Sequence, residues 1–275
     1  MIHDQKNIIN FYDRFNEDQR MQRNSLEYIR CKEIISRYLP KERFAILDIG
    51  GATGSFSFWL AEQGYDVSLI DIVPKHIEIA KSKEKKKGIK LESIIVGDAR
   101  SLPYEDDSFE IVILMGPLYH LIDKNERHKC LKEAYRVLKQ NGIIITEIIS
   151  RYASLFDGFL YGLVNDPEFV EIMKRDLKTG YHRDTSESKV YFTDSYFHRP
   201  EEIIQEKTDV GFNFEDLISV TGFGNVITNI EDKIKDEKYL NVLLETLRIT
   251  EKDPMLFSVS SHLMGIGKKV IVKKD

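Results

Sequence analysis

Three acidic residues stand at the ends of apolar runs, and their spacing indicates a binding site. The first run ends near Asp48 and leads into a glycine-rich turn from Gly50 to Gly54. The second run ends in Asp71, about 20 residues after the glycines, where a carboxylate can accept both hydroxyls of an adenosine ribose. A third run leads into Asp98. The pattern of strand, tight turn and helix lets backbone approach a nucleotide-like ligand, so we interpret the turn as a cofactor loop.

A fourth apolar run, Phe109 to Met115, leads into residues that could act on a second ligand. Tyr119 could shape a pocket, and His120 could accept a proton near neutral pH. The alternative for His120 is a structural histidine that is hydrogen-bonded beside the next helix. Both are candidate catalytic residues, and Tyr119 is also a candidate substrate contact.

Strand-like and helix-like segments alternate from Ala45 to Ile149, which predicts parallel strands joined by right-handed crossovers. The carboxyl ends of parallel strands lie at one edge of their sheet. The four runs therefore direct their terminal residues into a single crevice.

These segments resemble the class I S-adenosylmethionine-dependent methyltransferases, over a stretch from about Ala45 to Ile149. The resemblance implies S-adenosylmethionine as cofactor and S-adenosylhomocysteine as product. It implies an α/β fold with a Rossmann-like, seven-stranded, mostly parallel sheet, helices on both faces, and a last strand inserted antiparallel between strands five and six. The implied cofactor-binding residues are Asp48, Gly50, Gly51, Gly54, Asp71, Ile72, Asp98, Ala99 and Met115, joined by Tyr12 and Arg20 from the N-terminal segment.

The glycine turn departs from the family pattern of acid-x-Gly-x-Gly-x-Gly, because Ala52 takes the place of the middle glycine. Alanine adds only a methyl group, but it makes a close backbone approach at this position less certain. The dinucleotide fingerprint G-x-G-x-x-G fits less well, since Ala52 and Ser55 occupy its second and third glycine positions. A nicotinamide enzyme is therefore the weaker hypothesis.

The segments outside the core predict additions that recognise the methyl acceptor. We expect an N-terminal helical cap over 1–41, the cofactor-binding core over 42–150, a lid over 151–199, and completion of the sheet over 200–275 with a helical insertion at about 229–253. Long excursions of this kind are usually lids or binding loops. The aromatic residues of the lid include three candidate substrate contacts, Tyr152, Tyr181 and His182.

Composition and charge favour a small acceptor. The net charge of −5 argues against a large nucleic-acid surface. The one candidate basic patch, Lys81–Lys90, is more typical of a solvated helix end than of an RNA site. The loop after the fourth run also lacks the Asn-Pro-Pro-Tyr type signature of enzymes that methylate exocyclic amines. The main alternatives are an RNA or protein methyltransferase and a non-catalytic module that binds S-adenosylmethionine.

The remaining expectations concern the chain as a whole. Cys31 and Cys130 are expected to be reduced thiols, and no cluster has the local spacing of metal ligands, so no metal is predicted. With no bilayer-spanning run or signal peptide evident, we expect a cytoplasmic protein with no membrane partner. Either a monomer or a homodimer is compatible with the sequence.

Overall fold

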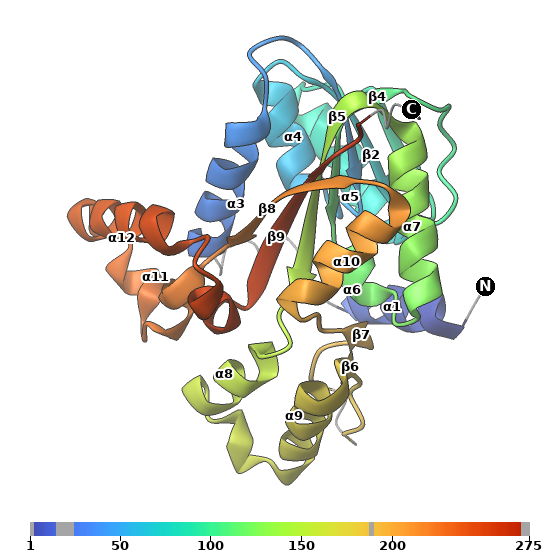
Figure 1. The fold of residues 1–275 in the computed structure, drawn as a ribbon. Helices are drawn as coiled ribbons and strands as arrows, with labels where there is room; N and C mark the ends of the chain where they lie inside the picture. The colour runs from blue at the N-terminus through green and yellow to red at the C-terminus, as the bar shows by residue number, and fades with distance from the viewer. Residues whose placement is uncertain (1–2, 15–24, 187–189, 271–275) are drawn as a thin grey trace, which may run out of the picture.

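The computed structural model describes residues 3–14, 25–186 and 190–270. Its centre is a seven-stranded sheet with the strand order β3-β2-β1-β4-β5-β9-β8 (Figure 1). The five strands from β1 to β5 are parallel, and β9 pairs antiparallel with both β5 and β8. The strands are β1 Ala45–Ile49, β2 Asp66–Asp71, β3 Ser93–Val96, β4 Phe109–Met115, β5 Leu138–Ile149, β8 Asn213–Ser219 and β9 His262–Lys268. The predicted fold, including the antiparallel last strand, is confirmed.

Helices cover both faces of the sheet, and the alternation of side chains along the central strands shows why. In β4, Val112 and Leu114 pack in one buried cluster, whereas Ile111 and Ile113 pack in the other. A strand that is apolar on both faces must be covered on both. One face is covered by α3 (Ser25–Tyr38), α4 (Ser55–Glu62) and α5 (Pro74–Lys87), and the other by α7 (Lys124–Val137) and α10 (Pro200–Val210).

The additions to this core lie at the edge where the parallel strands end (Figure 1). Helix α1 (His3–Arg14) approaches the crevice from the N-terminal segment. The excursion after β5 contains α8 (Ala153–Leu160), η1 (Leu163–Asn165), α9 (Pro167–Thr179), β6 (Tyr181–His182) and β7 (Ser195–Tyr196). A second excursion contains η2 (Gly222–Val226), α11 (Ile230–Lys233), α12 (Glu237–Thr250) and η3 (Pro254–Val259).

The described helices also bear on the membrane question. None of them combines the length and the apolar character that a bilayer crossing requires.

Candidate functional site

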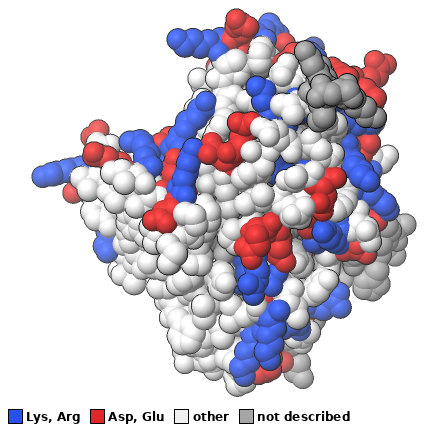
Figure 2. All heavy atoms as spheres, in the orientation of Figure 1, with Lys and Arg blue, Asp and Glu red and all other residues white. Residues whose placement is uncertain are grey.

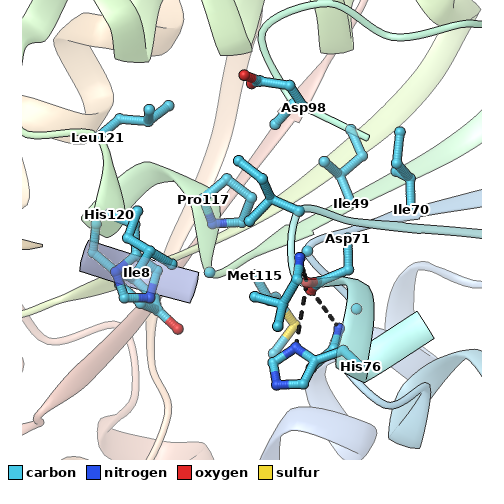
Figure 3. Close-up of a pocket in the computed structure, with 18 of the residues that line it drawn as sticks. Ile8, Ile49, Ile70, Asp71, His76, Asp98, Met115, Pro117, His120 and Leu121 are labelled. Atoms are coloured by element: carbon cyan, nitrogen blue, oxygen red, sulfur yellow. Dashed lines mark hydrogen bonds and ion pairs between the residues drawn. The ribbon is translucent and has the colours of Figure 1, made fainter. Parts of the chain in front are cut away.

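A cavity of about 370 Å³ lies at the carboxyl ends of β1, β2, β3 and β4. Its wall comes from the loops after these strands, from α1 and α3, and from the end of β5. In Figure 3, Met115 and Pro117 lie between His120 on one side and Asp71 on the other. The cavity therefore connects the predicted cofactor loop to the predicted acceptor loop.

The glycine loop forms the floor of this cavity, and it has no room for side chains at its first two glycines. Gly50 has a φ of 76°, and a Cβ atom there would lie 2.5 Å from Cδ of Pro117. A Cβ atom at Gly51 would lie 2.4 Å from Oδ2 of Asp48. Backbone is therefore presented to the cavity at both positions, as close approach to a ligand requires.

Ala52, the departure from the family pattern, closes the loop in the conformation that a glycine would adopt. Its φ is 48°, in the left-handed region that L-residues with a side chain rarely occupy. Its backbone N–H donates a hydrogen bond of 2.9 Å to Oδ2 of Asp71. This bond ties the glycine loop to the end of β2 and helps to hold Ala52 in the unfavourable conformation.

Asp48 lies beneath the loop and is almost fully buried. Burial raises the pKa of its carboxyl group to about 6, although a hydrogen bond from the Ser57 hydroxyl acts in the opposite direction. The Ser57 Oγ to Asp48 Oδ2 distance is 2.5 Å. The negative charge of the Asp48 carboxylate is therefore destabilised by burial. The residue lies beneath the glycine loop and also lines the cavity.

Asp71 ends β2, lines the cavity and also organises the backbone around it. Its Oδ1 accepts a hydrogen bond of 2.8 Å from the Val73 N–H, and Nδ1 of His76 lies 3.3 Å from the same oxygen (Figure 3). A carboxylate has about four lone-pair sites. Asp71 therefore keeps acceptor capacity for ribose hydroxyls, and the neighbouring Ile72 also lines the cavity.

The end of the cavity beyond β3 contains Asp98 and Ala99 together with a residue that the sequence did not indicate. Arg100 forms an ion pair with Asp98 at 2.6 Å and a second with Glu126 of α7, also at 2.6 Å. The hydrogen bonds that the Arg100 guanidinium donates to Asp98 raise the pKa of Arg100. Arg100 and Glu126 line the cavity, and their pairing fixes the orientation of the Asp98 carboxylate.

Tyr12 and His120 face each other at the opposite end. Tyr12 Oη lies 2.9 Å from Nε2 of His120, although the two residues are 108 positions apart in the sequence. His120 belongs to the short helix α6 (Pro117–His120), and its ring centroid lies 4.7 Å from that of Tyr119 and 5.6 Å from that of Phe192. Tyr12, predicted as a cofactor contact, therefore lies beside the two acceptor-side candidates Tyr119 and His120. Arg20, the other predicted cofactor contact of the N-terminal segment, lies outside the described residues.

Two buried glutamates also line the cavity, and sequence reasoning missed both. Glu27 lies on α3 and Glu147 lies near the end of β5, with 7% and 4% of their surfaces exposed. No local motif surrounds either residue. Only the packing of α3 against β5 brings them together.

The three lid candidates do not line this cavity. Tyr181 is 47% exposed, and Tyr152 is half-buried just before α8. His182 is buried, with Nδ1 at 2.7 Å from Oδ2 of Asp176 and Nε2 at 3.2 Å from the carbonyl oxygen of Phe192. His182 is therefore buried, although its sequence context is typical of a loop. It packs against Phe192, which in turn packs on His120.

Comparisons with known proteins agree with this geometry. Residues 47–146 match the family described as a methyltransferase domain. A ubiquinone/menaquinone biosynthesis C-methyltransferase of Pectobacterium carotovorum is 29% identical over 189 residues, which cover 64% of this chain and 69% of that protein. A 2-methyl-6-phytyl-1,4-hydroquinone methyltransferase of Oryza sativa is 32% identical over 107 residues, which cover 38% of this chain and 29% of that protein.

The same fold occurs among solved structures. A crystal structure of a methyltransferase from Methanosarcina mazei, described as dependent on S-adenosylmethionine, superposes with a TM-score of 0.60 at 21% identity, covering 86% of this chain and 97% of that one. The sequence matches and the cavity above the glycine loop lead to one conclusion. The chain carries a methyltransferase domain over residues 47–146 and is an S-adenosylmethionine-dependent methyltransferase, with S-adenosylmethionine as its cofactor.

Proposed function

We propose that this methyltransferase modifies a small molecule with an acidic hydroxyl group, such as a phenol or a hydroquinone, in the cavity between the glycine loop and the Tyr12–His120 pair. The observation that carries the proposal is the cavity itself. One cavity of about 370 Å³ joins the residues expected at the cofactor to a hydrogen-bonded tyrosine and histidine. The relatives named for quinone and hydroquinone substrates support an acceptor of this class.

The cofactor would lie along the glycine loop, and the residues present fit it. Gly50 and Gly51 offer backbone without side chains, Asp71 offers lone pairs for the ribose hydroxyls, and Asp98 with Ala99 would lie beside the adenine. When bound, S-adenosylmethionine supplies an electrophilic methyl group on a positively charged sulfur. The main task of the protein is then to hold the acceptor atom in line with that methyl group.

Tyr12 and His120 are placed to move a proton from the acceptor. An acceptor hydroxyl that donates to Oη of Tyr12 can pass its proton to that oxygen as Tyr12 passes its own proton to Nε2 of His120. The acceptor then carries the negative charge that makes it a nucleophile, and the imidazolium later releases its proton to solvent. Tyr119 and Phe192 pack around the His120 ring and restrict its orientation.

We infer that the additions to the core select the acceptor, with α1 and α3 of the N-terminal cap closing the cavity and the lid supporting it through Phe192. We place the protein in the cytoplasm, in keeping with the described helices, none of which is suited to a membrane crossing. Figure 2 shows Lys and Arg interspersed with Asp and Glu on the drawn face, which favours a small acceptor over a nucleic acid.

The test combines binding with turnover. We expect titration calorimetry to show micromolar binding of S-adenosylhomocysteine, and Asp71→Ala to weaken it by about 1 to 3 kcal/mol through the loss of charge-assisted hydrogen bonds. In a panel of phenols and hydroquinones, His120→Asn and Tyr12→Phe should lower turnover by about 10²- to 10⁴-fold and leave S-adenosylhomocysteine affinity unchanged.

The matched control is His128→Asn, which removes a histidine of α7 away from the cavity and should leave both measurements unchanged. Cofactor binding without turnover of any hydroxyl acceptor would overturn the proposed acceptor class. Full turnover in both His120→Asn and Tyr12→Phe would overturn the proton route.

A further inference from the structure

Three side chains from separate elements converge at the wall of the cavity. Glu27 of α3, Glu147 of β5 and His262 of β9 each present one potential metal-ligating atom, and these atoms all lie within 4.8 Å of one another. Glu27 and Glu147 line the cavity. Nδ1 of His262 lies 3.6 Å from Oε2 of Glu27, and the histidine side chain is 17% exposed.

The pairing of β5 with β9 dictates part of this arrangement. Glu147 lies directly opposite Met264, and His262 precedes Met264 by two residues on the same strand. Directly opposed residues of an antiparallel pair point to the same face, as do residues two apart along a strand. Glu147 and His262 therefore share a face of the sheet and are diagonal neighbours on it.

Helix α3 brings the third side chain over that face. The Cys31 thiol donates to Oε1 of Glu147 at 3.8 Å, and Ile34 and Ile35 are fully buried in the cluster beneath the helix. Glu27 lies one turn before Cys31 on the same side of the helix. A site built on two strands and a packed helix holds its ligands more precisely than one built on loops.

The side chains of this region offer donor atoms that a divalent cation accepts. Two carboxylates that are each more than nine-tenths buried lie within reach of one imidazole. A third carboxylate, Asp157 of α8, interacts electrostatically with His262.

We propose that Glu27, Glu147 and His262 form a binding site for a divalent transition-metal ion such as Zn²⁺ or Mn²⁺. Carboxylate oxygens with one imidazole nitrogen are a donor set that these ions accept, whereas Mg²⁺ and Ca²⁺ prefer oxygen ligands alone. Three protein ligands leave coordination positions open toward the cavity, as in catalytic metal sites.

The position of the site gives the ion a role that rests on the proposed function. An acceptor hydroxyl bound to the ion would have a lower pKa, because the ion stabilises the oxyanion that remains when the proton leaves toward Tyr12 and His120. Metal binding itself does not depend on that role. It can be measured with no acceptor present.

The experiment uses the full-length protein after treatment with EDTA and dialysis. Equilibrium dialysis against ZnCl₂ and against MnCl₂, with elemental analysis, should give one tightly bound ion per chain, and that ion should raise the melting temperature. Glu147→Gln and His262→Asn should each weaken binding by about ten-fold or more, because each removes a ligand. Glu245→Gln, on the exposed side of α12, removes a carboxylate elsewhere and should bind the ion as the wild type does.

Titration of the same samples with S-adenosylhomocysteine separates this site from the cofactor site and reports on folding. Variants that bind S-adenosylhomocysteine normally but lose the ion support the proposal. Should His262→Asn fail to fold, Glu27→Gln takes its place, since Glu27 lies on a helix outside the sheet. The proposal is overturned if the wild type binds no ion above the level of Glu147→Gln, or if all folded ligand variants keep wild-type affinity.

Discussion

The two ends of the cavity are built in different ways. At the cofactor end, a short stretch of chain from Asp48 to Gly54 presents backbone, and Asp71 holds it through a hydrogen bond to the Ala52 N–H. At the acceptor end, side chains come from elements far apart in the sequence, as the Tyr12–His120 pair shows. The cofactor end is therefore built from a local stretch of sequence, whereas the proposed acceptor end depends on tertiary packing.

The acceptor end also depends on a buried ionic brace. Arg127 of α7 donates to the carbonyl oxygens of Leu121 and Ile122 at 2.9 and 2.7 Å, directly after His120, and pairs with Glu206 of α10 at 2.7 Å. Burial acts to raise the pKa of Glu206, but the nearby His198 and Arg127 outweigh it and lower the pKa to about 2. The segment after His120 is therefore held by an arginine of a buried charge pair, whereas the glycine loop is held by a hydrogen bond from its own backbone to the Asp71 carboxylate.

The largest effect is expected from Arg127→Met, which removes one partner of that brace. It leaves the Glu206 carboxylate buried near His198 alone, and we expect the free energy of unfolding to fall by about 3 to 5 kcal/mol. Urea denaturation measures this loss. Lys129→Met on the exposed side of the same helix, paired with the partly exposed Glu126, should cost no more than about 1 kcal/mol.

A double variant, Arg127→Met with Glu206→Leu, sharpens the test. Removing both charges leaves no uncompensated carboxylate, so much of the stability should return. Turnover should remain low in the double variant because Leu121 and Ile122 have lost their donor. A loss below 1 kcal/mol in the single variant would show that the brace does not hold the acceptor end.

The second prediction concerns the cofactor end. In Gly51→Ala the new Cβ atom would lie 2.3 Å from Cδ1 of Leu69 and 2.4 Å from Oδ2 of Asp48, which Ser57 holds in place. The loop must shift, and we expect the affinity for S-adenosylhomocysteine to fall about 100-fold, or about 2.7 kcal/mol, in titration calorimetry. Gly88→Ala is the control, since no atom lies within 4 Å of the position that its Cβ atom would take. The φ of 67° at this position strains an alanine, but the variant should bind the ligand normally.

The two ends of the cavity also differ in how much of their structure the sequence could predict. The order of strands and the placement of Asp48, Asp71 and Asp98 at one edge followed from apolar runs and their spacing, because parallel strands connected by helices have few possible arrangements. The Ala52 departure raised a doubt about the loop. Its left-handed φ of 48° shows that the turn keeps its shape without the glycine.

The acceptor end was less accessible to sequence reasoning. Glu27, Glu147 and His262 converge through tertiary packing alone, so no spacing indicates them. His182 follows Gly180 in a context typical of a loop, yet its partner Asp176 lies six residues earlier on α9 and draws it into the interior. Long-range packing decided the case of the glutamates and His262, whereas His182 was decided by a buried partner one short turn away that the loop-like context did not indicate.

The third prediction uses the raised pKa of Asp48. The folded state holds a proton on Asp48 up to about pH 6, whereas an aspartate in the unfolded chain releases it near its ordinary pKa of 3.8. Asp48 therefore supports stability fully below about pH 4, and this contribution is lost as pH rises through about 6. At pH 7 the buried charge costs about 1 to 3 kcal/mol, the order of magnitude of a two-unit shift.

Asp48→Asn removes this charge. Without ligand, the variant should be more stable than the wild type at pH 7 by that amount and similar to it at pH 4, as measured by urea denaturation at both pH values. Taking the difference from the wild type cancels the titration of Asp157, whose pKa also lies at about 6. A constant difference across this range would contradict the assignment of the raised pKa to Asp48.

The smallest effect is expected from Ala52→Gly, which restores the glycine that the family pattern has at this position. The left-handed conformation costs an alanine about 1 to 2 kcal/mol relative to glycine, and the greater freedom of glycine in the unfolded chain returns part of that gain. We expect a net stabilisation of about 0.5 to 1 kcal/mol with unchanged S-adenosylhomocysteine affinity, because the N–H bonded to Asp71 remains. The same substitution in a regular helix, Ala61→Gly in α4, should have the opposite sign and cost about 1 kcal/mol. Destabilisation by both substitutions would mean that Ala52 does not carry backbone strain, and that the two ends of the cavity differ less in their construction than the geometry of the loop indicates.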